Sequence, residues 1–492
     1  MDLLRWCVKN RLLLLLLGVI AAFQLVTIRP GFLAGEDTFL YLSHARNLAF
    51  GWPYGATDFI HTTEAALYSP AAYPPVFPIL LAPVYRFSGL NPQPYKILLV
   101  STLMLCLVVI ARLYRNQGTL QLLLVVALLG FNPFITEQKN QILSDLPFLL
   151  FVCLLLALCS TLWERDGKGS PYFWPGICVG LLSYLAYGTR SIGIGLIPCI
   201  IAFGLIRYRR IASFSMVAAG VFALLAMLQS WLVSSNSDYL RLAVWDPRAA
   251  ARNLHFYVGT TSYLWDAGVG TSPRIVVFAL ATCLFLVGAW KGIREPLDLA
   301  TFFSIGYGLF LIFWPMHQGR YLLPLLPVYL YLVARGLFSV RDFISRRWPT
   351  IGTVAAGAVA GILLLTYAGK YRTSDFGPNP DAWDSAAAMQ LYDFVRDATP
   401  QNAIFIAGGP RALALYTGRR AARFPEQHMD RETLSEYIDK VGATYLVASR
   451  IDSDQWAILC RSLGGTGPVF SNPSYTVYKA SPVPSGKKLS SP

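Results

Sequence analysis

Long apolar runs alternate with short polar segments through the first three quarters of the chain. Runs such as 12–28, 120–135 and 351–367 are about as long as the hydrocarbon core of a bilayer is thick. Each run predicts a transmembrane helix. About eleven spans fit, centred near residues 20, 104, 127, 154, 180, 199, 222, 282, 307, 330 and 359. The pattern therefore predicts a polytopic α-helical membrane protein.

The last quarter of the chain has a different pattern. Helix-like periods at 384–397 and 431–441 alternate with short β-branched or apolar runs at 403–407, 444–448 and 475–478. We predict a transmembrane domain over residues 1–370, a small α/β domain over 371–480 and a disordered tail over 481–492. Gly408-Gly409-Pro410, after the first strand, hints at an anion-binding turn but matches no full phosphate-loop pattern. We interpret it as a turn.

Composition supports the membrane interpretation. The chain is 55% hydrophobic and 14% charged with a mean hydropathy of +0.47, which excludes a soluble globular protein. Its net charge of +14 lies almost wholly in the first 370 residues, because basic and acidic residues nearly balance beyond them. The excess is therefore a topology signal and not a nucleic-acid site. The eight cysteines form no CxxC pair, and their sequence positions imply no disulfide framework.

The basic residues set the predicted topology. Loops rich in arginine and lysine stay in the cytoplasm, and they hold Arg112 and Arg115, Arg165 and Lys168, Arg207, Arg209 and Arg210, Lys291 and Arg294, and Arg341, Arg346 and Arg347. With a cytoplasmic amino terminus, the carboxyl-terminal domain is extracytoplasmic. The outer segments are then 31–93, 132–145, 188–191, 234–273 and 317–320. They lack a usable Asn-x-Ser/Thr sequon, which favours a bacterial plasma membrane.

The first outer segment begins with an acidic pair, Glu36-Asp37. At helical spacing Asp37, Tyr41 and His44 share one face of an amphipathic outer helix. Acidic residues are favoured in a first helical turn, so simple helix initiation is one interpretation. In the functional interpretation, one carboxylate accepts a proton from a hydroxyl while its neighbour positions it or holds a metal ion. We predict Asp37 as the base.

The second outer turn carries Glu137, Lys139 and Asp145. Asp145 begins a descending helix just before a run of leucines, where an ionisable group is costly. A capping role and a role in a site are both open for this aspartate.

Two outer arginines are candidate phosphate ligands, because a guanidinium matches phosphate oxygens. Arg190 lies between two apolar runs, where snorkelling to the headgroups is the alternative. Arg320 lies in His317-Gln318-Gly319-Arg320-Tyr321, just before a proline-punctuated span. His317 alone is weak support for a metal site and suits a hydrogen-bonding anchor equally well.

Taken in order, these motifs resemble the GT-C superfamily of polytopic glycosyltransferases, in particular the bacterial protein mannosyltransferases and lipid A aminoarabinose transferases. The resemblance covers most of residues 1–340. It rests on Glu36-Asp37 with Tyr41 and Gly51, Tyr73-Pro74-Pro75, Ser144-Asp145-Leu146-Pro147, Thr189-Arg190-Ser191-Ile192-Gly193 and Gly319-Arg320-Tyr321-Leu322-Leu323-Pro324. The family's acidic motif is often Asp-Glu or Asp-Asp, whereas this chain has Glu-Asp.

The resemblance implies outer juxtamembrane helices and a glycosyltransferase, transferring a hexosyl or pentosyl group with inversion from a polyprenyl-phosphate carrier. Its partners would be that donor, a glycan, lipid or protein acceptor, and membrane lipids, without nucleic acid. Asp37 would deprotonate the acceptor, while Asp145 or Glu36 would orient it or share a divalent cation, which the resemblance permits but does not require. Arg190 and Arg320 would hold the donor phosphate. The remaining candidate substrate-binding residues are Tyr41, Glu137, Lys139, His317 and Tyr321.

A transporter or flippase of a lipid-linked saccharide is the competing hypothesis. Such a protein also needs many spans and outward-facing charges. It should bury ionisable groups near the bilayer midplane, whereas these spans are almost free of them except near their ends.

Overall fold

The computed structural model describes residues 10–33, 35–65, 70–165, 172–233, 247–314, 316–425, 430–464 and 467–480. Residues 234–246 of the predicted outer segment and the predicted disordered tail 481–492 lie outside this set. The chain forms two compact units. The helical unit comprises Met1–Arg29, Gln93–Leu232 and Asp238–Gly377, and the α/β unit comprises Pro30–Pro92, Val233–Ser237 and Pro378–Pro492.

Apolar helices occupy all of the predicted span positions in the helical unit. Within the described residues, seven segments are long and apolar enough to cross a membrane: α5 (Pro92–Leu113), α8 (Asp145–Arg165), η2 with α10 (Ser191–Gly195, Leu196–Tyr208), α11 (Ser213–Leu232), α13 (Thr271–Ile293), η4 with α15 (Gly319–Leu325, Leu326–Ser345) and α16 (Pro349–Thr373). An eighth is the bent pair α6 (Thr119–Gly130) and α7 (Pro133–Asn140). The shorter helices are α2 (Arg11–Val26), α9 (Phe173–Tyr187) and α14 (Leu299–Phe313), and α12 (Pro247–Tyr263) precedes α13. The prediction of a polytopic helical membrane fold is confirmed.

The bend of 46° between α6 and α7 has a local cause. Pro133 begins α7, and the side chain of Asn132 caps that helix by accepting from the backbone N–H of Phe134. A break inside an apolar region frees backbone groups, which need new partners. Gln24 of α2 supplies one, because its amide donates to the Gly130 carbonyl at 2.7 Å and to Thr136 Oγ1 at 2.9 Å.

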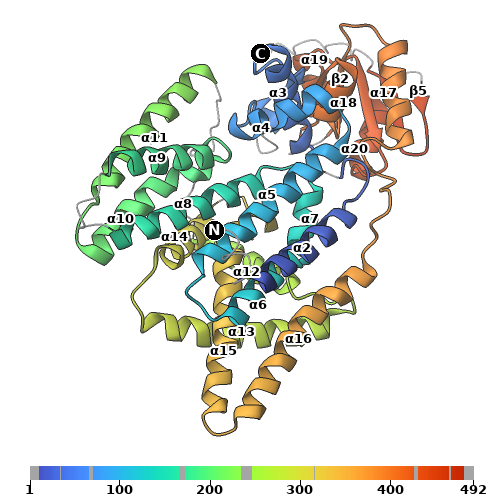
Figure 1. Cartoon of the computed structure of the whole chain (residues 1–492). Helices are drawn as coiled ribbons and strands as arrows, with labels where there is room; N and C mark the ends of the chain where they lie inside the picture. Colours follow the sequence, from blue (N-terminus) through green and yellow to red (C-terminus); the bar gives the residue numbers. More distant parts are fainter. Residues whose placement is uncertain are drawn as a thin grey trace, which may run out of the picture. The chain divides into compact units, whose positions relative to one another are not determined.

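Close approach of α13 and α15 depends on two glycines. A Cβ at Gly288 would overlap the carbonyl oxygen of Leu332, and one at Gly336 would overlap that of Leu284. Small residues let helices pack backbone to backbone where lipid provides no hydrophobic drive. In Figure 1, α15 lies beside α13 and continues into α16 through a short turn.

The α/β unit contains one six-stranded sheet with the strand order β1-β3-β2-β4-β6-β5. β1 (Phe59–Ile60), β3 (Arg420–Arg423), β2 (Ile404–Ala407) and β4 (Tyr445–Ser449) are parallel to one another. β6 (Tyr475–Lys479) pairs antiparallel with β4, and β5 (Pro468–Ser471) pairs antiparallel with β6. The helices of this unit are α3 (Asp37–Phe50), η1 (Thr63–Ala65), α4 (Val76–Ser88), α17 (Ala386–Ala398), α18 (Pro410–Thr417), α19 (Arg431–Val441) and α20 (Asp454–Leu463). The predicted small α/β region is confirmed.

Alternating side chains of the sheet build a core on each face. Ile406 of β2 packs with Leu434 of α19 and Trp456 of α20. Its neighbour Phe405 points to the other face, where it packs with Leu391 of α17 and Leu413 of α18. The period of two along a strand explains why β2 is apolar throughout, since helices cover both of its faces.

The first outer segment belongs to this sheet. Phe59 and Ile60 of β1 pair with Ala421 and Ala422 of β3, and the Asp58 carbonyl accepts from the Ala421 N–H at 3.0 Å. Our predicted domain division placed residues 30–92 with the transmembrane domain, but the structure groups them with the α/β unit. The reason is β1: a two-residue strand gives no recognisable pattern in the sequence, and its partner lies in the distant carboxyl-terminal segment. In Figure 1, α3 and α4, in blue, lie beside α18 and β2, in orange.

Candidate functional site

The acidic motif lies at the start of α3, as predicted. Glu36 is the N-cap residue and Asp37 the first helical residue, where the helix dipole favours negative charge. The helix ends at Gly51, whose φ of +72° closes it in the left-handed conformation that glycine adopts readily. The helix that the sequence predicts after the acidic pair is therefore present.

Three residues on one face of α3 contact Tyr73. The Tyr73 hydroxyl donates to Asp37 Oδ1 at 2.7 Å, its ring stacks on Tyr41 at 4.4 Å between centroids, and its backbone N–H donates to His44 Nε2 at 3.3 Å. The predicted shared face of Asp37, Tyr41 and His44 is confirmed. The proline stretch that follows Tyr73 begins α4, which packs against α3.

The Asp37 carboxylate also accepts from an arginine far away in the sequence. Arg411 Nη1 of α18 donates to Asp37 Oδ1 at 3.0 Å. The Arg411 side chain is 1% exposed, whereas that of Asp37 is 22% exposed. The guanidinium lies over the ring of Phe59 at 4.9 Å and near that of Tyr73 at 6.0 Å, which compensates part of its desolvation. The Arg411 guanidinium is thus buried, whereas the Asp37 carboxylate that it binds is accessible to solvent.

Glu36 binds the amino terminus of the same helix, α18. Its Oε2 accepts from the backbone N–H of Arg411 at 2.8 Å. Burial raises the pKa of Glu36 to about 7, although attraction by the Arg411 guanidinium opposes this shift. A Cβ at Gly409 would lie 2.8 Å from Glu36 Oε1, so glycine allows the close approach. Glu36 therefore has a capping role between two helices.

This contact explains the turn that hinted at anion binding. Gly408-Gly409-Pro410 follows β2, at the carboxyl ends of parallel strands, where helix amino termini bind anions in α/β folds. The group found there is the chain's own Glu36 side chain, whose Oε2 accepts from the Arg411 N–H. We interpreted the segment as a plain turn and did not identify Arg411, which follows it. The residue types pointed to an anion site, but nothing local in the sequence named its occupant.

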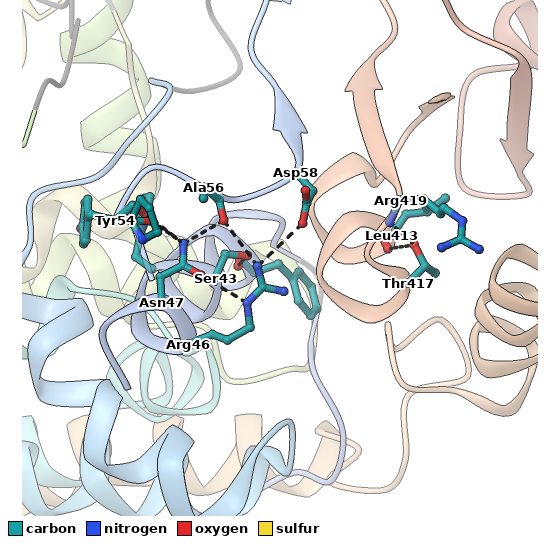
Figure 2. Close-up of polar contacts among 12 residues, drawn as sticks. Ser43, Arg46, Asn47, Tyr54, Ala56, Asp58, Leu413, Thr417 and Arg419 are labelled. Atoms are coloured by element: carbon teal, nitrogen blue, oxygen red, sulfur yellow. Dashed lines mark hydrogen bonds and ion pairs between the residues drawn. The ribbon is translucent and has the colours of Figure 1, made fainter. Parts of the chain in front are cut away.

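A neutral histidine anchors the loop after α3. His44 is fully buried, and its Nδ1 donates to the Tyr54 carbonyl at 2.9 Å while Nε2 accepts from Tyr73. Burial lowers the pKa of His44 to about 4, and the nearby Arg411 charge lowers it further, against the Tyr54 hydrogen bond. Figure 2 shows the neighbouring Asn47 amide, which donates to the carbonyls of Tyr54 and Ala56. These bonds fix the loop that leads into β1.

A second acid and arginine pair lies in the helical unit. Asp145, at the start of α8, forms an ion pair with Arg190, which precedes η2. The Arg190 guanidinium lies over the ring of Tyr321 in η4, at 5.0 Å. The Asp145 side chain is 5% exposed and that of Arg190 is 17% exposed. In this pair the carboxylate is the more buried member and the guanidinium is the more exposed one.

The other predicted substrate-binding residues differ in their surroundings. Lys139 is fully buried, and its ammonium donates to the Gln24 carbonyl and to Thr27 Oγ1 at the end of α2, which favours a structural role. Glu137 is exposed on α7. His317 is exposed, with its ring 4.5 Å from that of Phe256, and Arg320 is half-buried in η4. Their substrate contacts stay predictions.

The carboxylates were also metal candidates. Within the part of the chain that the structure describes, no group of three or more His, Cys, Asp or Glu side chains is arranged to hold a metal ion. At the acidic motif the Arg411 guanidinium, 3.0 Å from Asp37, already supplies a positive charge where a cation would bind. The arrangement of Glu36 and Asp37 therefore does not favour a metal ion.

Comparison with known proteins relates this architecture to solved structures. No family model matches the chain, and the sequence matches no curated protein. The archaeal oligosaccharyltransferase AglB from Archaeoglobus fulgidus, in complex with an inhibitory peptide and a dolichol-phosphate, is similar with a TM-score of 0.61 and 13% identity, over 90% of this chain and 70% of AglB.

ArnT from Cupriavidus metallidurans is similar over nearly its whole length. Its apo structure has a TM-score of 0.59 and 13% identity, over 96% of this chain and 99% of ArnT. Its complex with undecaprenyl phosphate has a TM-score of 0.57 and 13% identity, over 97% and 99%. Identities this low establish shared architecture and nothing finer. The chain shares the fold of AglB and ArnT, which agrees with the fold that the sequence resemblance implied.

Proposed function

We propose that the protein is a membrane glycosyltransferase that moves a sugar from a polyprenyl-phosphate carrier to an acceptor hydroxyl, with inversion at the anomeric carbon. The shared fold supports this, since structures with that fold hold dolichol-phosphate in AglB and undecaprenyl phosphate in ArnT. The acceptor is a glycan, lipid or protein and the sugar a hexose or pentose. The basic loops support a plasma-membrane protein with its chemistry on the extracytoplasmic side.

The main observation behind this proposal is the exposure of Asp37. Its side chain is 22% exposed and accepts hydrogen bonds from Tyr73 and Arg411. Glu36 is only 9% exposed and its carboxylate caps α18. Asp37 is therefore the better base, because a general base must come within hydrogen-bond reach of the proton it accepts.

In the proposed reaction, Asp37 takes the proton from the acceptor hydroxyl. The acceptor oxygen forms a bond to the anomeric carbon as the bond from that carbon to the phosphate oxygen breaks. The leaving phosphate carries the electron pair. Arg190, oriented by Asp145, offsets this developing charge, and Arg320 is a second candidate for the same role.

The test is sugar transfer from a panel of radiolabelled polyprenyl-phosphate sugars in membranes that contain the protein. We expect Asp37→Asn to lower transfer by about 10²- to 10⁴-fold, the usual contribution of a general base, at unchanged expression. Asp58→Asn is the matched control. Asp58 lies in the same unit with φ of +57°, a conformation that asparagine also adopts, so its transfer rate should stay near that of the native chain.

Equal transfer by the native chain and Asp37→Asn would exclude Asp37 as the base. No transfer from any donor, with competent acceptors shown to be present, would favour the flippase hypothesis. Labelled lipid-linked saccharide should then cross proteoliposome membranes that contain the protein.

A further inference from the structure

The carboxyl-terminal segment contributes to the acidic motif through two contacts. Arg411 Nη1 donates to Asp37 and the Arg411 backbone N–H donates to Glu36, so a single residue of α18 binds both members of the pair. These contacts join residues 374 and 375 positions apart. The parallel pairing of β1 with β3 fixes the same two segments against each other, since β3 directly follows α18.

The burial of Arg411 decides which role it can have. With 1% of its side chain exposed, the guanidinium cannot reach a donor phosphate or an acceptor without rearrangement. It can act through Asp37, whose carboxylate is 22% exposed. Aromatic contacts with Phe59 and Tyr73 restrict the guanidinium plane, which an ammonium group would not reproduce.

We propose that Arg411 is a positioning residue, whose buried guanidinium holds the Asp37 carboxylate oriented toward the acceptor hydroxyl. The inference rests on the proposed function. It makes the carboxyl-terminal segment part of the reaction machinery, although that segment lies far from the motif in sequence.

The test compares Arg411→Met, Arg411→Lys and Arg419→Met in the full chain. Methionine keeps the length of the side chain without its charge, and lysine restores the charge without the planar stack. Arg419→Met is the control, because Arg419 lies in the same unit and donates to the carbonyls of Arg396 and Thr399 instead of a carboxylate. kcat and the donor KM for transfer are measured together with the unfolding midpoint.

For Arg411→Met we expect kcat to fall at least about tenfold while the donor KM stays near its native value, because the buried guanidinium acts through Asp37. Arg411→Lys should recover only part of kcat, since the ammonium restores the charge without the planar stack. Arg419→Met should leave kcat and the donor KM unchanged.

A lower unfolding midpoint with an unchanged kcat would show a purely structural role and overturn the proposal. A raised donor KM with an unchanged kcat would make Arg411 a phosphate ligand and also overturn it. If the native chain transfers no sugar, the proposed function fails by itself. A double-mutant cycle of Arg411→Met and Asp37→Asn on the unfolding midpoint then tests the pairing: additive effects overturn it, and non-additive effects support it.

Discussion

The α/β unit and the helical unit each contain an aspartate in the first turn of a helix, paired with an arginine from a distant segment. In the α/β unit the Asp37 side chain is 22% exposed and Arg411 is 1% exposed. In the helical unit the order is reversed, because Asp145 is 5% exposed and Arg190 is 17% exposed. One pair presents a carboxylate to solvent and the other presents a guanidinium.

This difference shows how the same two side chains can serve opposite chemical tasks. The buried member fixes the orientation and charge of the exposed one, and the exposed member is available to a ligand. An exposed carboxylate suits proton acceptance, whereas an exposed guanidinium suits a phosphate. The comparison therefore supports a base at Asp37 and a phosphate ligand at Arg190.

Beyond Asp37→Asn, the largest effect that tests the comparison is expected at Arg190. Arg190→Met should raise the donor KM by about tenfold to hundredfold, since a hydrogen bond to a charged group contributes about 1.5–3 kcal/mol. It should also destabilise the protein by about 3 kcal/mol, because Asp145 would stay buried without its partner. Transfer kinetics and thermal unfolding in detergent measure the two effects.

The double variant Arg190→Met with Asp145→Asn separates them. It should recover most of the stability but none of the donor affinity. Arg341→Met is a suitable control, because Arg341 pairs with Asp342 at an exposed position of the same unit. Recovery of donor KM in the double variant would remove Arg190 from the phosphate site and break the comparison.

A second prediction concerns the pH dependence of the α/β unit. Burial raises the pKa of Glu36 from 4.5 to about 7, so its stabilising contribution is complete below pH 4.5 and is lost as pH rises through 7. Burial lowers the pKa of His44 from 6.5 to about 4, so its contribution is complete above pH 6.5 and is lost as pH falls through 4. Each amounts to about 3 kcal/mol at most.

The contributions of Glu36 and His44 to the free energy of unfolding change with pH in opposite directions between pH 4.5 and 6.5. Glu36→Gln should remove the contribution of Glu36, so that only the contribution of His44 remains. The variant should therefore lose stability on acidification more steeply than the native chain. The unfolding midpoint across this range measures the slope. Glu432→Gln, which changes an exposed glutamate of α19, should behave like the native chain. An unchanged slope in Glu36→Gln would show that Glu36 does not titrate as described.

The smallest effect is expected at Tyr73, whose hydroxyl is the second donor to Asp37. Tyr73→Phe should lower kcat/KM by about fivefold, equivalent to about 1 kcal/mol for one hydrogen bond. Tyr437→Phe is the control, since that hydroxyl donates to the Arg423 carbonyl in the same unit. Equal effects of the two changes would mean that Tyr73 contributes only packing and does not orient Asp37.

Several features could be predicted from the sequence because their signals are local. The hydropathy of each span is carried by its own residues, so a helix lies at each predicted position, including the bent pair that begins its second helix at Pro133. The face of α3 that carries Asp37, Tyr41 and His44 follows from helical spacing alone. The strands and helices of the last quarter follow from their own periods.

The tertiary structure decided which distant groups meet. Asp37 and Arg411 lie 374 positions apart, and Lys139 looked like an outer-loop cation until the end of α2 accounted for its hydrogen bonds. The sequence determined that this chain spans a membrane and carries acidic and basic candidates at helix ends. Only packing decided which member of each pair is buried, because burial depends on every segment that closes over a side chain and not on its neighbours in sequence.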